Sequence, residues 1–170
     1  MGTFAVYHRE KGSPADDERE TINLLMRIAM LGCGYVANMY RLTLPLHPEL
    51  ELAGVYDVDE ARARNMAQLT SSRQYPSFES MLADARVDLI LNLTNPRVHF
   101  ETTRRCLEAG KDVYTEKPLA LELGQAKELV DLAVRSHLAL SSAPCTLLNE
   151  AGQTLWRAIR EQVVGPVRMV

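Results

Sequence analysis

Two stretches of the sequence combine residue types and spacing that suit chemistry with a nucleotide. Residues 32–37 read Gly-Cys-Gly-Tyr-Val-Ala, a Gly-x-Gly-x-x-Ala pattern at the end of an apolar run. About twenty residues further on, Asp57 ends a second apolar run. A glycine-rich turn followed by an acid at this distance is the order that a dinucleotide-binding βαβ unit needs.

Each position of the glycine pattern has a physical task in such a unit. Gly32 permits a tight turn, Gly34 lets backbone N–H groups approach a pyrophosphate, and Ala37 allows close packing of the helix on the strand. The anion then lies at a helix N-terminus, which favours negative charge. The alternative is an ordinary tight turn, and the flanking pattern argues against it. The cofactor contacts expected here are Gly32, Cys33, Gly34, Tyr35 and Val36.

Asp57 predicts the choice of cofactor. A carboxylate at this position accepts hydrogen bonds from both ribose hydroxyls of an adenosine and repels a 2′-phosphate, so NAD is favoured over NADP. Arg62 and Arg64 follow closely and could weaken this preference, although on a helix a solvated face is the simpler interpretation. The alternative for Asp57 itself is an acid that only forms a turn.

Two further stretches resemble the signatures of a known family. Residues 94–99 read Thr-Asn-Pro-Arg-Val-His, and residues 110–118 read Gly-Lys-Asp-Val-Tyr-Thr-Glu-Lys-Pro. They are similar to the Thr-Pro-Pro-x-x-His and Gly-Lys-His-Val-x-x-Glu-Lys-Pro motifs of the glucose–fructose oxidoreductase/inositol dehydrogenase (Gfo/Idh/MocA) family, and with the glycine turn they cover residues 26–142. The resemblance implies a pyridine-nucleotide oxidoreductase acting on a secondary alcohol of a sugar, cyclitol or other small polyol.

The resemblance also implies roles for individual residues. Lys117 would be the catalytic lysine, hydrogen-bonding the substrate oxygen beside the nicotinamide and stabilising its alkoxide character. Glu116 would contact the nicotinamide ribose. Without the family, these two residues could be a surface ion pair worth under about 1 kcal/mol. The further implied cofactor contacts are Thr94, Asn95 and Pro96 as a wall, His99 near the ribose or phosphates, and Lys117 itself.

The sequence departs from the family pattern at two places. Asn95 stands where the motif has its first Pro, which alters the rigidity of that loop. Cys145 lies in Ala-Pro-Cys-Thr, where a subgroup often has Asp, and it is either a reactive thiol or, more simply, a small packed residue. These departures leave the substrate class open.

The two ends of the chain carry separate expectations. Residues 1–24 are charged and contain Gly and Pro, which predicts a flexible N-terminal tail ahead of a dinucleotide-binding domain at 25–145. Residues 146–170 are expected to form a linking helix and the start of a second α/β domain, cut after a first strand at 167–170. In the family that domain supplies the general base and the dimer interface. We therefore expect a homo-oligomer, and cofactor binding without turnover by these 170 residues.

The loops need a scaffold that brings them together. Apolar runs alternate with helical patterns at spacings of roughly 20 to 30 residues, which predicts an α/β fold with a doubly wound parallel (Rossmann) sheet. All of the loops described would then follow the carboxyl ends of strands, where such sheets bind ligands. Strands are expected at 25–31, 51–56, 73–75, 87–93, 112–114 and 138–142, and helices at 35–44, 60–69, 77–83, between 96 and 110, and at 121–137.

Three polar residues are expected to fix this scaffold locally. Asp59 and Ser77 stand where N-caps of the second and third helices belong. Asn92 is the polar interruption of a buried apolar strand, so it must find a hydrogen-bond partner.

Composition narrows the classes of partner. The chain is 46% hydrophobic and 24% charged with a net charge of −3, and it has neither an apolar run long enough for a membrane span nor a basic patch for nucleic acid. Three widely spaced cysteines predict no disulfide framework and fit a reducing cytoplasm. The four histidines show no metal-ligand spacing, so no metal site is expected.

Two other functions remain compatible with the sequence. One is a non-catalytic nucleotide-binding or regulatory module, against which the Glu116-Lys117-Pro118 run argues. The other is an NAD-dependent glycoside hydrolase, since some relatives of the family use a transient oxidation to cleave a bond.

Overall fold

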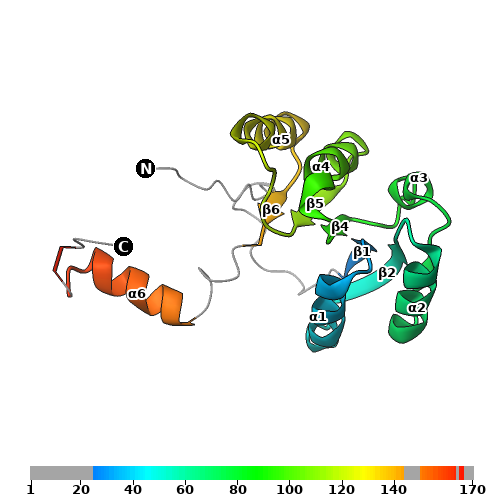
Figure 1. Ribbon diagram of the computed structural model, residues 1–170, viewed down its shortest axis with the longest axis horizontal. Coiled ribbons are helices and arrows are strands. Elements are labelled where there is room, and N and C mark those ends of the chain that lie inside the picture. The colour runs from blue at the N-terminus through cyan, green and yellow to red at the C-terminus, as the bar shows by residue number, and fades with distance from the viewer. Residues whose placement is uncertain (1–24, 144–149, 164, 167–170) are drawn as a thin grey trace, which may run out of the picture.

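The computed structural model describes residues 25–143, 150–163 and 165–166. Its centre is a six-stranded sheet in the order β3-β2-β1-β4-β5-β6, in which every neighbouring pair is parallel (Figure 1). This is the strand order of a Rossmann fold, and the predicted doubly wound parallel sheet is confirmed. The strands are β1 (Met26–Leu31), β2 (Leu50–Tyr56), β3 (Arg73–Gln74), β4 (Leu89–Asn92), β5 (Asp112–Thr115) and β6 (Leu140–Ser142).

Helices cover both faces of the sheet. Figure 1 shows α1 and α2 on one face and α3, α4 and α5 on the other, while α6 stands apart from the sheet. The predicted caps are confirmed, because the side chain of Asp59 accepts from the N–H groups of Ala61 and Arg62 and that of Ser77 accepts from Ser80. The helices are α1 (Tyr35–Thr43), η1 (Leu44–Leu46), α2 (Glu60–Thr70), α3 (Phe78–Leu82), η2 (Pro96–Val98), α4 (His99–Glu108), α5 (Leu123–Ser136) and α6 (Glu150–Arg160).

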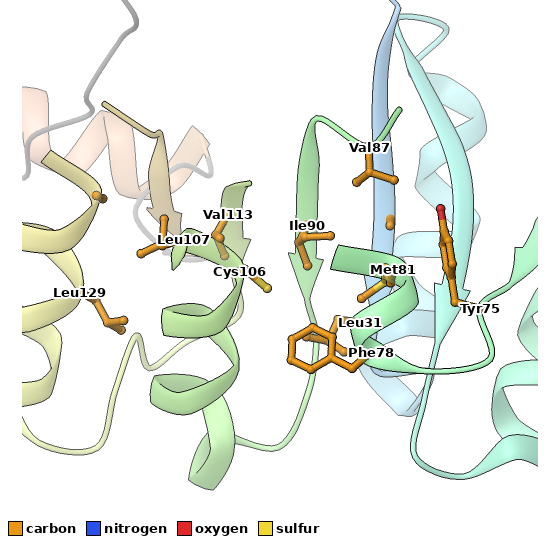
Figure 2. Packing of buried hydrophobic residues seen from close by; sticks show 12 residues of the cluster. Leu31, Tyr75, Phe78, Met81, Val87, Ile90, Cys106, Leu107, Val113 and Leu129 are labelled. Atoms are coloured by element: carbon orange, nitrogen blue, oxygen red, sulfur yellow. The ribbon is translucent and has the colours of Figure 1, made fainter. Parts of the chain in front are cut away.

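Each face of the sheet has its own hydrophobic core. Along β1 the side chains alternate, with Ile28 and Met30 in the core under α1 and α2, and Ala29 and Leu31 in the core under α3, α4 and α5. Figure 2 shows the second core, where Ile90 and other fully buried side chains fill the space between the sheet and these helices. Burial of each large side chain contributes about 1.5–3 kcal/mol, so the strands that carry the loops are firmly held.

A buried lysine holds the turn before β4. Lys111 is only 8% exposed, and its Nζ donates hydrogen bonds to the carbonyl oxygens of Asp84 (2.7 Å) and Val87 (2.8 Å). The preceding Gly110 has φ +76°, a conformation that suits glycine after the end of α4. Gly110 and Lys111 therefore have a structural task, which is to end α4 and to hold the turn before β4.

Some predicted boundaries shift in the structure. The strand expected at 87–93 is shorter in the structure and runs over Leu89–Asn92, after which the backbone of Leu93 and Thr94 passes close to Gly32. The helix expected after Pro96 begins with the short turn η2, and α4 starts at His99. The expectations for residues 1–24, for Cys145 and for a strand at 167–170 lie outside the described residues.

Two kinds of feature are absent from the described ranges. No helix there is long and apolar enough to cross a membrane. Within the same residues, no group of three or more His, Cys, Asp or Glu side chains is placed to hold a metal ion.

Candidate functional site

The glycine turn after β1 is shaped by a close approach of two backbones. Gly32 has φ +93°, and a Cβ placed there would lie 2.8 Å from the carbonyl carbon and oxygen of Leu93. Both facts require glycine at this position. Gly34 differs, because a Cβ there would meet nothing within 4 Å. The space beside Gly34 is therefore open for a ligand to approach the backbone.

Helix α1 presents its N-terminus to this space. Gly34 is its N-cap, no side chain caps the helix, and no acidic residue lies in the first turn. The first N–H groups of a helix lack intrahelical partners and favour an anion. Ala37 is fully buried, so α1 packs closely against the strand as predicted, while Tyr35 is 83% exposed.

Asp57 connects the ends of β1 and β2. Its Oδ2 accepts from the backbone N–H of Cys33 at 2.7 Å, and its Oδ1 accepts from the N–H of Asp59 at 2.8 Å. Each carboxylate oxygen can accept a second hydrogen bond, so the group can still bind ribose hydroxyls. Burial, helped by the charge of Asp57, raises the pKa of the Cys33 thiol to about 12. The thiol is therefore neutral, and Cys33 contacts Asp57 through its backbone N–H.

The loop after β4 is organised by Asn92, which is fully buried. Its Nδ2 donates to the hydroxyls of Thr102 (2.8 Å) and Thr103 (3.0 Å), and its Oδ1 accepts from the hydroxyl of Thr94 at 2.7 Å. The predicted need of Asn92 for partners is thus met, and one partner is a candidate site residue. Asn95 is exposed, and its side chain accepts from the N–H of Arg97, which lies in η2.

His99 joins the loops after β4 and β5. Its Nδ1 lies 2.7 Å from the carbonyl oxygen of Pro118, and its Nε2 lies 2.9 Å from that of Thr94. The side chain is fully buried, so in this structure it holds the two loops together. A direct contact with a cofactor would require these loops to open, and it stays a prediction.

Glu116 follows the end of β5 and is held by two donors. Its Oε1 accepts from the hydroxyl of Tyr40 at 2.8 Å, and its Oε2 accepts from the backbone N–H of Lys117 at 3.1 Å. Its own N–H donates to the carbonyl of Asn92, which ties the loop to β4. Tyr40 comes from α1 and was not among the residues that the sequence singled out.

Lys117 is exposed beside Glu116, and the peptide bond between Lys117 and Pro118 is cis. The side chains of Glu116 and Lys117 form no ion pair, and the hydrogen bond between these two residues uses the backbone N–H of Lys117. The surface ion pair considered as the alternative is therefore not what the structure shows. Lys117 follows β5 at the same sheet edge as the glycine turn, which follows β1.

Comparison with known proteins decides the family. Residues 26–143 match the sequence profile of Gfo/Idh/MocA, described as an oxidoreductase family with an NAD-binding Rossmann fold. This chain belongs to the Gfo/Idh/MocA family. The resemblance drawn from the motifs is thereby confirmed, and the chain carries an NAD(P)-binding oxidoreductase domain.

Relatives of the Gfo/Idh/MocA domain include several dehydrogenases. The UDP-N-acetylglucosamine 3-dehydrogenase of Acidithiobacillus ferrooxidans is 29% identical over 78% of this chain and 41% of its own length. The myo-inositol 2-dehydrogenase of Thermotoga maritima is 28% identical over 82% of this chain and 42% of its own length. The chain thus spans less than half the length of these two curated relatives.

Solved structures of the same fold contain either nicotinamide cofactor. The WlbA dehydrogenase of Chromobacterium violaceum, solved with NADH and UDP-GlcNAcA, matches with a TM-score of 0.77 and 33% identity over 82% of this chain and 41% of that one. KijD10, a 3-ketoreductase of Actinomadura kijaniata solved with NADP, shares the fold with a TM-score of 0.77 and 24% identity over 84% of this chain and 46% of that one. The family therefore supports a nicotinamide cofactor without deciding between the two forms.

A hollow beside Asp57 adds space for a ligand to the Gfo/Idh/MocA site. Its volume is about 430 Å³, and Val58, Gln74 and Pro76 are among its lining residues, so it lies beyond the ends of β2 and β3. The neighbouring arginines are occupied, because Arg62 pairs with Asp59 and Arg64 pairs with Glu60 on α2. Asp57 itself forms no ion pair with the described residues, so its negative charge is not matched by these arginines.

The structure brings the sequence-predicted site residues of the Gfo/Idh/MocA domain to one edge of the sheet. The glycine turn, Asp57, the Thr94 loop and the Glu116 loop all follow carboxyl ends of parallel strands. The sequence missed Tyr40 and the role of Asn92 in orienting Thr94. Helical spacing placed Tyr40 on the predicted helix at 35–44, but no local pattern pairs it with a residue 76 positions away.

Proposed function

We propose that this domain binds NAD⁺ along the carboxyl edge of its sheet and carries the catalytic lysine for oxidation of a secondary alcohol. The observation that carries the proposal is the position of Glu116 and Lys117. Both residues directly follow β5, at the sheet edge that also carries the uncapped N-terminus of α1, and the Glu116 carboxylate is held there by the hydroxyl of Tyr40 and the backbone N–H of Lys117. A cofactor lying along this edge would have its pyrophosphate at α1 and its nicotinamide end near Lys117.

The charge near the adenosine end supports NAD⁺ over NADP⁺. Asp57 retains acceptor capacity for ribose hydroxyls, and its negative charge opposes a 2′-phosphate. Arg62 would be the natural partner of that phosphate, but its guanidinium is bound to Asp59 at 3.0 Å. The hollow beside Asp57 offers room for the adenine ring.

Lys117 would act on the substrate oxygen. When bound, the nicotinamide cofactor would supply the acceptor for the hydride that leaves the carbinol carbon. The ammonium of Lys117 would donate a hydrogen bond to the alcohol oxygen and stabilise the negative charge that develops on it. Sugars, cyclitols and similar polyols are the proposed substrates, since relatives include enzymes named for UDP-N-acetylglucosamine and myo-inositol.

For these 170 residues, we propose cofactor binding without turnover. Alcohol oxidation also needs a base that removes the hydroxyl proton. The histidine nearest to Lys117 along the described loops is His99, and both of its ring nitrogens face carbonyl oxygens. It is therefore badly placed to be that base. Formation of NADH by this chain with myo-inositol or UDP-N-acetylglucosamine would contradict this part of the proposal.

Calorimetric titration of the chain with NAD⁺ and with NADP⁺ tests the proposal. We expect saturable binding of NAD⁺, with weaker binding of NADP⁺, and a loss of about 1–3 kcal/mol of NAD⁺ affinity in Asp57→Ala. Asp88→Ala is the matched control. The carboxylate of Asp88 also accepts from a backbone N–H of β1, that of Arg27 at 2.8 Å, but it lies at the opposite edge of the sheet. Absence of NAD⁺ binding at millimolar concentration, or equal losses in both variants, would overturn the proposal.

A further inference from the structure

Tyr40 links the helix at the glycine turn to the loop that carries Lys117. It lies on α1, which starts at the glycine turn, and its hydroxyl donates to Oε1 of Glu116 at 2.8 Å. The Tyr40 ring meets the ring of Tyr114 edge to face, with centroids 6.3 Å apart and planes inclined by 66°. Because Tyr114 belongs to β5, the phenol is held between the helix and the strand that precedes Glu116.

The carboxylate of Glu116 is thereby oriented by one donor on each oxygen. Tyr40 binds Oε1, and the backbone N–H of Lys117 binds Oε2 at 3.1 Å. Two donors on different oxygens fix the plane of a carboxylate, whereas a single donor lets it rotate. Each oxygen keeps the capacity to accept one more hydrogen bond. That remaining capacity suits the hydroxyl pair of a ribose.

The phenol acts as a permanent donor. Burial, followed by its hydrogen bond to Glu116, raises the pKa of Tyr40 far above its usual value. The hydroxyl therefore stays protonated over the range in which a dehydrogenase works, and it always presents its proton to the carboxylate.

We infer that Tyr40 is a positioning residue that sets the Glu116 carboxylate to receive the ribose next to the nicotinamide. The inference rests on the proposed function, since it assumes that a dinucleotide lies along this edge. It adds a mechanical link between the pyrophosphate end and the reactive end of the site. Without the phenol hydroxyl, Glu116 would keep its charge but lose its fixed orientation.

Three ligands that share an adenosine separate this role from a general structural one. ADP lacks the second ribose, ADP-ribose contains it, and NAD⁺ adds the nicotinamide. Calorimetric titrations should show that Tyr40→Phe lowers the affinity for ADP-ribose and for NAD⁺ about 3- to 10-fold and leaves the affinity for ADP unchanged. In a Glu116→Ala background, Tyr40→Phe should have no further effect, because the group that it positions is gone.

Controls make each outcome decisive. Thr43→Val removes a hydroxyl on the same helix that bonds the carbonyl of Tyr40 at 3.1 Å, and it should leave all three affinities unchanged. ADP affinity also reports that each variant is folded. An equal loss for ADP in Tyr40→Phe, or a loss that persists in the Glu116→Ala background, would overturn the inference alone. Failure of the wild type to bind any of the three ligands would overturn the proposed function together with it.

Discussion

Replacement of Gly32 by alanine should destabilise the folded chain for two reasons. The first is conformational, because φ +93° is unfavourable for a residue with a Cβ by about 1–2 kcal/mol. The second is steric, because the Cβ would lie 2.8 Å from the carbonyl of Leu93 and 2.9 Å from the N of Thr94. Both are backbone atoms, so the strand end must shift, at a further cost of about 1–3 kcal/mol. We expect Gly32→Ala to lower the free energy of unfolding by about 2–5 kcal/mol.

Two other glycines serve as matched controls. Gly110 has φ +76° but open space where a Cβ would be added, so Gly110→Ala should carry only the conformational cost of about 1–2 kcal/mol. Gly34 has φ −81° and nothing within 4 Å, so Gly34→Ala should change stability by less than about 0.5 kcal/mol. Its added methyl group would instead occupy the space where a pyrophosphate approaches the backbone. Gly34→Ala should therefore lose NAD⁺ affinity while remaining folded.

Urea unfolding followed by circular dichroism measures the three stabilities, and calorimetry measures NAD⁺ binding. The expected order of destabilisation is Gly32→Ala, then Gly110→Ala, then Gly34→Ala. A Gly32→Ala variant no less stable than Gly110→Ala would refute the close approach of the two backbones. A Gly34→Ala variant that binds NAD⁺ like the wild type would refute the placement of the pyrophosphate.

Three more predictions concern the scaffold. Lys111→Met should lower the free energy of unfolding, measured in urea, by about 2–4 kcal/mol, because the buried carbonyl oxygen of Val87 and the partly buried one of Asp84 lose their donor. Lys127 is exposed, so Lys127→Met should have little effect and serves as the control. Hydrogen bonds from Arg86 are the first cause that holds the pKa of Asp84 below its ordinary 3.8. The stabilisation of the fold by the Asp84 carboxylate is therefore complete above about pH 4 and is lost as the pH falls further. The free energy of unfolding, measured from pH 5 downward, should depend less on pH in Asp84→Asn, and an unchanged dependence would contradict this. Burial raises the pKa of the Cys106 thiol to about 12, so the thiol should not react with iodoacetamide at pH 8 in the native chain but should react in urea. Mass spectrometry measures the alkylation, and rapid labelling of Cys106 in the native chain would contradict its burial.

The parts of the fold that the sequence predicts are those governed by short-range rules. Asp59 and Ser77 were recognisable as caps because a cap is defined by its neighbours within three residues. Gly32 was recognisable because a strand-to-helix turn needs a positive φ. The parallel, doubly wound sheet followed from the alternation of strands and helices, since crossovers in such sheets are right-handed.

The parts that the sequence did not predict depend on which side chains meet across the sheet. Asn92 needed a partner, yet the sequence could not say that Thr94, Thr102 and Thr103 would share it. His99 was assigned to the cofactor because its loop pattern resembled the family motif. In the folded chain its ring lies between two loops, bound to the carbonyl of Pro118, which is 19 residues away.

The loops of the site are fixed by one another as well as by their own neighbours in sequence. Asp57 holds the N–H of Cys33 in the glycine turn, His99 bridges two other loops, and Tyr40 orients Glu116. Each of these bonds joins segments that belong to different strands or helices, so a change in one loop alters the geometry of the next. Substitutions along this edge should therefore be non-additive, with coupling free energies of about 0.5–3 kcal/mol between directly bonded pairs. Lys111 and Glu116 flank opposite ends of β5 and share no hydrogen-bond partner, so their effects on stability should add.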